Sequence, residues 1–252
     1  MSSEIHWNLH QKDGEPDVEI WLLHGLGDSS KTWANLFAHP GMSGLQLTAP
    51  DLPGFGLTPS NVDETSLDHV AHEVIELIDD RRRSESIFLV GHSMGGDLGT
   101  LIAQSQPSWL RQFVNVEGNL TEGDTFISKA ASESSDFNDW FEGFIQTIQV
   151  LTDQGIIDES CMKSLQQCSR SIFLSLALDM VRRANEMGTI FSSLEIDTSY
   201  WYSANSISQQ TLQLLTEQNI KSIDFKGKGH WIMHDKTDEF VNALNVFVDN
   251  LD

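Results

Sequence analysis

Short hydrophobic runs alternate with segments of helical periodicity along most of the chain. The runs at 18–23, 45–49, 87–90 and 113–116 are mostly apolar, and the first two end at turns that contain glycine or proline. Between them, residues 66–80 carry apolar positions at i, i+3 and i+4 spacing. Strands buried on both faces give such continuous apolar runs. The pattern predicts an α/β fold with a mostly parallel β-sheet flanked by helices.

The remaining segments extend this alternation to both ends of the chain. Residues 4–10 alternate in character and predict an edge strand, and residues 94–104 predict a helix. Near the C-terminus we predict strands at 199–203 and 220–225 and helices at 209–218 and 237–249.

The rhythm changes after Glu117, where strand patterns cease for about seventy residues. From 119 to 191 the apolar spacing is helical throughout, with two apolar faces that include Phe137, Trp140 and Phe173. We predict a core formed by residues 1–118 and 192–252, with residues 119–191 inserted as a helical cap.

Composition narrows the classes of partner. The 252 residues include 15 Lys and Arg against 37 Asp and Glu, a formal charge of −22 that repels nucleic acid and anionic membranes. The first residues lack a basic leader with an apolar core, and no apolar run is long enough to span a bilayer. We expect a cytoplasmic protein that acts on a small molecule.

The sharpest motif is G-x-S-x-G at residues 91–95, directly after the strand at 87–90 and before a helix. A serine on such a turn presents its hydroxyl above the sheet edge, and the glycines permit the close approach that the turn requires. Ser93 is therefore the predicted nucleophile. The backbone N–H of Met94, in the first helical turn, is free to donate to an oxyanion.

Two further turns supply the groups that an attacking serine needs. His24-Gly25-Leu26-Gly27 follows a strand, and the N–H of Leu26 is the candidate second oxyanion donor. Near the C-terminus, His230 follows Gly229 just beyond the last predicted strand. A histidine must take the serine proton and return it to the leaving group, and we favour His230 over its rival His234.

These motifs, HGLG, DLPGFG, GHSMGG and the late GH, in this order and on these elements, resemble the α/β-hydrolase superfamily with a cap domain. The resemblance spans almost the whole chain. It implies Ser93 as nucleophile, His230 as general base and then acid, and Leu26 and Met94 as oxyanion donors. It also implies a helical cap inserted after the family's sixth strand, which corresponds here to 113–116.

The acid that should orient the histidine departs from the family pattern. Most members carry an aspartate after the seventh strand, but residues 202–207 read YSANSI and contain no carboxylate. Some members take the acid from the end of the sixth strand, where this chain has Glu117. We predict Glu117, with Asp197, Asp124, a neutral Asn205 and the absence of a functional acid as the alternatives.

No motif indicates a cofactor. Residues 226–229 lack the length and the Ser or Thr of a phosphate-binding loop, no G-x-G-x-x-G follows the first apolar strand, and we expect neither a nucleotide nor a metal. The candidate substrate-binding residues flank the motifs or belong to the cap aromatics: His24, Gly25, His92, Trp140, Phe144 and Trp231.

The expected function is that of a serine hydrolase that cleaves a small to medium, mainly apolar carboxylic ester through an acyl-enzyme. The same residues would serve lactones, thioesters or carbon–carbon bonds. The alternatives are a hydrolase-like binding protein or receptor, and a cofactor-free lyase or C–C hydrolase on the same scaffold.

Overall fold

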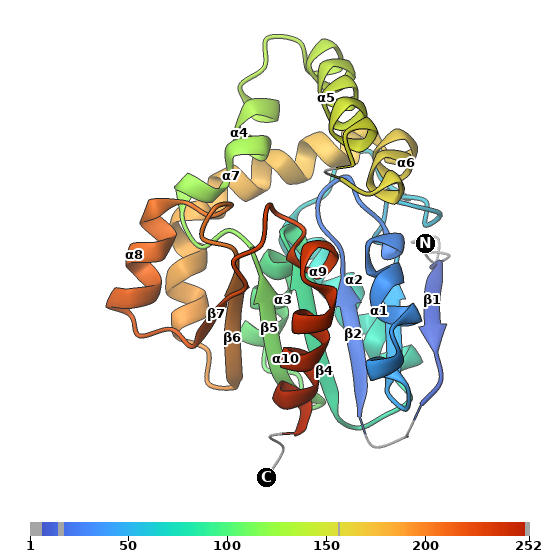
Figure 1. The fold of residues 1–252 in the computed structure, drawn as a ribbon. Coiled ribbons are helices and arrows are strands. Elements are labelled where there is room, and N and C mark those ends of the chain that lie inside the picture. The colour runs from blue at the N-terminus through green and yellow to red at the C-terminus, as the bar shows by residue number, and fades with distance from the viewer. Residues whose placement is uncertain (1–6, 15–17, 156, 250–252) are drawn as a thin grey trace.

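The computed structural model describes residues 7–14, 18–155 and 157–249. The described strands form one seven-stranded sheet in the order β1-β3-β2-β4-β5-β6-β7, in which β1 is antiparallel to β3 and the other pairs are parallel (Figure 1). The strands are β1 Leu9–Lys12, β2 Glu19–Leu23, β3 Gln46–Pro50, β4 Ile87–His92, β5 Leu110–Val116, β6 Asp197–Tyr202 and β7 Ser222–Asp224.

Helices cover both faces of the sheet and its upper edge in Figure 1. The α-helices of the body are α1 Ala34–Ala38, α2 Leu67–Arg81, α3 Met94–Gln104, α8 Gln209–Glu217, α9 Ile232–Asp235 and α10 Thr237–Asp249. Those between β5 and β6 are α4 Phe126–Ser132, α5 Phe137–Asp153, α6 Glu159–Gln167 and α7 Arg170–Ser192. Short 3₁₀ turns lie at Ser30–Trp33, Pro40–Met42 and Glu122–Asp124.

The central strands are apolar on both sides because each face packs against its own layer of helices. In β2, Ile20 and Leu22 belong to the cluster that includes α10, whereas Trp21 and Leu23 belong to the cluster that includes α2 and α3. Alternate residues of a strand point to opposite faces, so a continuous apolar run is what two covered faces require. The predicted fold class is confirmed.

The predicted elements agree with the structure most closely after the G-x-S-x-G motif and at the C-terminus, where α3 and α10 have the predicted bounds. The expected strand at 4–10 is wrong in its position: residues 4–6 lie outside the described residues, and β1 runs from Leu9 to Lys12. The last strand is also shorter than predicted, Ser222–Asp224 rather than 220–225.

The segment between β5 and β6 contains helices and no strand among its described residues. Helices α4, α5 and α6 lie above the carboxyl ends of the strands (Figure 1). The long helix α7 continues down to the body, where the ring of Phe191 packs edge-on against Phe113 of β5 at 6.0 Å. Helix α7 thus packs the segment between β5 and β6 against the body of the protein.

Among the described helices, none combines the length and the apolar character needed to cross a bilayer.

Candidate active site

Ser93 occupies the sharp turn between β4 and α3. Its backbone has φ 52° and ψ −122°, a left-handed conformation that costs energy in a residue with a side chain. A Cβ on Gly91 would overlap the carbonyl oxygen of Gly95, and one on Gly95 would overlap that of Leu23. The two motif glycines are therefore needed for the turn to close against the neighbouring strand.

The loop after β2 runs beside this turn. A Cβ added to Gly25 would lie 3.1 Å from the Ser93 Cβ, which shows how closely the loop approaches the serine. Leu26, the next residue, lines the same pocket as Ser93. Met94 is the first residue of α3, where an N–H group lacks an intrahelical acceptor. Both predicted oxyanion donors therefore lie on segments adjacent to Ser93.

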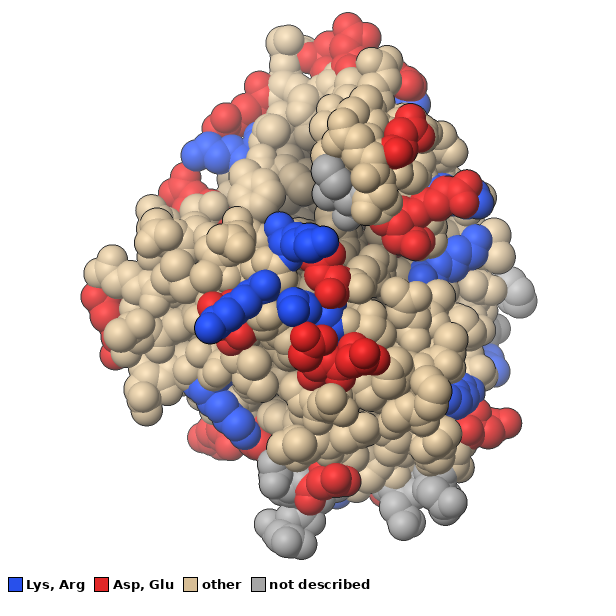
Figure 2. All heavy atoms as spheres, viewed as in Figure 1, with Lys and Arg blue, Asp and Glu red and all other residues tan. Residues whose placement is uncertain are grey.

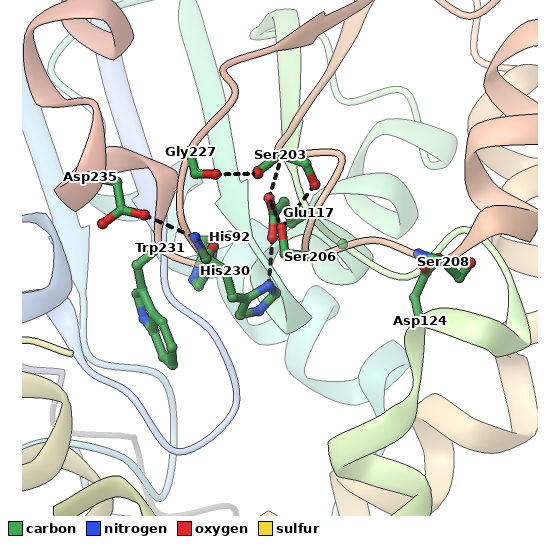
Figure 3. Close-up of polar contacts among 12 residues, drawn as sticks. His92, Glu117, Asp124, Ser203, Ser206, Ser208, Gly227, His230, Trp231 and Asp235 are labelled. Atoms are coloured by element: carbon green, nitrogen blue, oxygen red, sulfur yellow. Dashed lines mark hydrogen bonds and ion pairs between the residues drawn. The ribbon is translucent and has the colours of Figure 1, made fainter. Parts of the chain in front are cut away.

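His230 and Glu117 form a hydrogen-bonded pair. The Nδ1 atom of His230 lies 2.7 Å from Oε2 of Glu117, and the Glu117 side chain is fully buried (Figure 3). Glu117 follows the last residue of β5 and has φ 53°, so the chain turns sharply there and the carboxylate lies at the sheet edge. Nδ1 donates to this carboxylate, which leaves Nε2 as the atom that can accept a proton.

The second oxygen of Glu117 is held by the loop after β6. Its Oε1 atom accepts hydrogen bonds from the Ser203 N–H at 2.7 Å and from the Ser206 hydroxyl at 2.6 Å (Figure 3). This is the loop in which the sequence shows no carboxylate. It supplies donors to an acid on the neighbouring strand instead, and three donors stabilise a buried carboxylate.

The other candidates for the acid have different partners. Asp197, at the start of β6, pairs with Lys221 at 3.0 Å. Asp124 accepts from the Leu120 and Thr121 N–H groups near the start of the cap. The Asn205 amide donates weakly to the Gly227 carbonyl at 3.4 Å. Glu117 is the one candidate that the described structure brings to His230.

His92 supports the segment that carries His230. Burial holds the pKa of His92 well below its usual value, and the nearby His230 ring lowers this pKa further. The neutral ring can donate from Nε2 to the His230 carbonyl oxygen, which lies 3.0 Å away. Its Nδ1 is buried without a hydrogen-bond partner among the described residues. His92 also lines the pocket, as Gly25 and Trp231 do.

Two other histidines are bound to the backbone. His24 bridges the Gly25 carbonyl and the Leu52 N–H at 2.8 and 2.9 Å, and burial lowers its pKa. It is not among the described residues that line the pocket, in contrast to its predicted role. The rival histidine, His234, places Nε2 2.7 Å from the Thr32 carbonyl oxygen.

Ser93 and His230 line one pocket. Among the described contacts no hydrogen bond joins them, and in many enzymes this contact tightens only when substrate binds. The pocket encloses about 800 Å³ of empty space, part of which is open to solvent. Its wall is completed by the helical segment between β5 and β6, through Phe126, Ile127, Ser128, Phe144, Ile148, Cys161, Leu165 and Met180.

The aromatic residues of α5 divide between the pocket and the packing of α5 against neighbouring helices. Phe144 lines the pocket, whereas Trp140 is not among the described lining residues. Trp140 stacks on Phe144 with ring centroids 5.1 Å apart and also contacts Phe137 and Phe173. The predicted substrate-binding role of Trp140 is therefore at most indirect, through the packing of Phe144.

Sequence reasoning missed several residues at this site. Ser203 and Ser206 carry no motif, and their contact with Glu117 joins segments almost ninety residues apart. Asp28, directly after the HGLG motif, also lines the pocket, and its position in that loop was a signal that could have identified it. No cluster of His, Cys, Asp and Glu suited to a metal occurs among the described residues.

Curated relatives are distant and longer than this chain. A 2-hydroxy-6-oxononadienedioate/2-hydroxy-6-oxononatrienedioate hydrolase from Escherichia coli O81 (strain ED1a) is 22% identical over 192 residues, which make up 74% of this chain and 65% of that enzyme. The match to another curated relative covers 42% of its length. The chain thus spans less than two thirds of the length of these relatives.

Solved structures share the fold over nearly the full length. A thermophilic esterase from Thermogutta terrifontis superposes with a TM-score of 0.74 at 14% identity, covering 97% of this chain and 93% of the esterase. The enol-lactonase from Burkholderia xenovorans LB400 gives 0.77 at 12% identity, covering 98% and 96%. A sequence model of the alpha/beta hydrolase fold matches residues 20–239. The chain therefore belongs to the α/β-hydrolase fold family.

Proposed function

We propose that this protein is a serine hydrolase that cleaves a small to medium, mainly apolar carboxylic ester, with Ser93, His230 and Glu117 as its catalytic triad. The observation that carries the proposal is the 2.7 Å contact between His230 Nδ1 and Glu117 Oε2, beside a serine held on a strained turn in the same pocket. The mainly apolar cap wall favours an apolar acyl or alcohol group.

In the first half of the reaction, the Ser93 hydroxyl attacks the ester carbonyl carbon while His230 Nε2 accepts its proton. Glu117 keeps the other ring nitrogen protonated and stabilises the imidazolium that forms. The N–H groups of Leu26 and Met94 bind the oxyanion. The tetrahedral intermediate then collapses, His230 protonates the departing alcohol, and an acyl group remains on Ser93.

In the second half, His230 removes a proton from water as the water attacks the acyl-enzyme. The second tetrahedral intermediate uses the same oxyanion donors and releases the carboxylic acid and free Ser93. We favour an ester bond because two of the solved structures that share this fold are an esterase and an enol-lactonase, and both names denote cleavage of an ester linkage. The distant similarity to a dioate hydrolase makes a carbon–carbon bond the competing target.

The test is intact-mass spectrometry after exposure to a fluorophosphonate, which needs no knowledge of the substrate. We expect one adduct on the wild type and none on Ser93→Ala. Ser128→Ala removes another pocket hydroxyl, which donates to the Met180 sulfur, and should retain the adduct. If the wild type is labelled, enzyme that has not been exposed to the probe should hydrolyse a series of 4-nitrophenyl esters with a Ser93-dependent burst of 4-nitrophenol.

An unlabelled wild type, or an adduct that survives in Ser93→Ala, would contradict the proposed nucleophile. Labelling of Ser93 without turnover of any ester in the series would contradict the proposed substrate class while leaving the nucleophile in place.

A further inference from the structure

Asp28 is a buried carboxylate in the wall of the catalytic pocket. It follows the loop that carries Leu26, it is 5% exposed, and it lines the pocket with Ser93, His230 and Trp231. The mechanism proposed above gives it no role. A carboxylate taken out of water is costly unless donors or a cation replace its hydration.

The described hydrogen-bond donors to Asp28 are neutral groups, and they lie closer to one carboxylate oxygen than to the other. Oδ1 accepts from the Ser29 N–H at 2.9 Å. Oδ2 has two weaker contacts, with the Trp231 indole N–H at 3.4 Å and the Cys161 thiol at 4.0 Å. No Lys or Arg forms an ion pair with Asp28 among the described residues. Oδ2 is thus a buried oxygen without a strong partner, between two residues that themselves line the pocket.

The other two carboxylates of the pocket wall are fully engaged. Glu117 has three donors, from His230, Ser203 and Ser206. Asp124 accepts from four residues of its surroundings, Leu120, Thr121, Ser208 and Thr211. Asp28 is therefore the carboxylate with capacity left for an occupant of the pocket.

The described pocket wall contains no Lys or Arg, although it contains Asp28, Glu117 and Asp124. On the outer surface, by contrast, basic and acidic side chains lie among one another, as the face in Figure 2 shows. An occupant of the pocket therefore experiences negative charge and aromatic rings, including Phe126, Phe144 and Trp231. Carboxylates and aromatic faces both attract cations and repel or fail to hold anions.

We propose that Asp28 selects an ester that carries an ammonium group, with Oδ2 of Asp28 and the Trp231 ring as its binding site. This inference rests on the proposed ester hydrolysis and specifies its substrate class. It also implies discrimination against esters that carry a carboxylate, because such a charge would approach Asp28 without any basic group in the described wall to compensate it.

The test compares three butanoate esters of similar shape: the 2-(trimethylammonio)ethyl ester, its neutral isostere the 3,3-dimethylbutyl ester, and the anionic 3-carboxypropyl ester. We expect wild-type kcat/KM to be at least tenfold higher for the cationic ester than for the neutral one, and lowest for the anionic ester. Asp28→Asn should reduce the ratio of kcat/KM between the cationic and the neutral ester about tenfold.

The matched control is Asp153→Asn, which makes the same change in net charge at an exposed end of α5. It should leave all three values unchanged. An equal loss of preference in Asp153→Asn would mean that net charge alone steers the substrate, and would overturn the role of Asp28. If Asp28→Asn does not fold, wild-type kcat/KM decides: equal values for the cationic and neutral esters overturn the proposal.

The two proposals fail in distinguishable ways. If the probe labels Ser93 but the untreated wild type has equal kcat/KM for the cationic and neutral esters, the ammonium site alone is refuted. If Ser93 is not labelled and no ester is hydrolysed, the ester hydrolase is refuted, and binding of butyltrimethylammonium, followed by tryptophan fluorescence, still tests the site. Binding to the wild type that Asp28→Asn weakens at least fivefold supports it, and equal or absent binding overturns it.

Discussion

The Nδ1 atom of His230 and the Oε2 atom of Glu117 lie 2.7 Å apart although 113 residues separate them in the chain. Glu117 directly follows β5, and His230 lies in the loop between β7 and α9. Parallel strands bring their carboxyl ends to one edge of the sheet, so groups at strand ends meet across long stretches of sequence. The carboxylate beside His230 thus follows β5, and the loop after β6 provides two of its hydrogen-bond donors.

Replacing Glu117 tests that assignment directly. Glu117→Gln keeps the shape of the side chain but removes the charge that stabilises the imidazolium and the group that fixes the His230 tautomer. In a working triad this loss lowers kcat on the order of 10⁴-fold. The measurement is kcat for a 4-nitrophenyl ester. Asp197→Asn, at the start of β6 and paired with Lys221, is the control and should leave kcat unchanged. A kcat for Glu117→Gln within about threefold of wild type would exclude Glu117 as the acid.

Ser206 gives a second test of the same network. Its hydroxyl donates to Glu117 Oε1 at 2.6 Å, so Ser206→Ala removes one of three donors to a buried carboxylate. A hydrogen bond to a charged group is worth about 1.5–3 kcal/mol, and part of this loss should appear as a fall in kcat of about tenfold. KM should change little, and Ser93 should still react with the fluorophosphonate. A rise in KM together with the fall in kcat would instead indicate a direct role in substrate binding.

The sequence was sufficient for the fold and for the positions of Ser93 and Glu117 because both depend on local pattern. Apolar periodicity identified the strands, and the motif at 91–95 placed Ser93 on a strand-to-helix turn. The contact between Glu117 and His230 could be predicted because the position of Glu117 at the end of a strand places its side chain at the edge of the sheet. The hydrogen bonds from Ser203 and Ser206 to Glu117 could not be predicted, because no sequence motif marks these serines and only the tertiary structure brings them to Glu117.

The cap shows a different limit. Helical periodicity correctly groups Trp140 and Phe144 on one apolar face, but it does not say which residue of that face reaches the pocket. In the structure Phe144 lines the pocket, whereas Trp140 packs on Phe144 and Phe173. That distinction depends on the crossing of α5 with its neighbours, which side-chain spacing within one helix does not encode.

Two glycines should respond oppositely to replacement by alanine. In Gly95→Ala the new Cβ would overlap the backbone of Leu23, which cannot move without disturbing β2, so we expect a loss of more than about 2 kcal/mol of stability. Gly143 lies within α5 with no atom within 4 Å of an added Cβ. Because alanine favours helix by about 1 kcal/mol over glycine, Gly143→Ala should stabilise the protein. Urea unfolding measures both, and equal effects would contradict the tight packing around the serine turn.

Asp97 provides a prediction about pH. It lies on the first turn of α3, is 1% exposed, and accepts from the Asn119 N–H and side-chain amide at 2.7 Å each. Burial raises the pKa of Asp97 from 3.8 to about 8, although the Asn119 hydrogen bonds oppose the rise. At a pH between these two values, the folded protein therefore holds a proton on Asp97 that the unfolded chain has released.

The sign of the effect follows from that difference in bound protons. The contribution of Asp97 to stability is fully present below its unfolded pKa, near 3.8, and is lost as the pH rises through about 8. Within this window one proton of difference lowers the free energy of unfolding by at most about 1.4 kcal/mol per pH unit. Asp97→Asn cannot titrate and can still pair with the Asn119 amide. The stability of this variant relative to wild type, from urea unfolding between pH 5 and pH 8, should therefore increase with pH. A constant difference would mean that Asp97 is already ionised in the folded protein across this range.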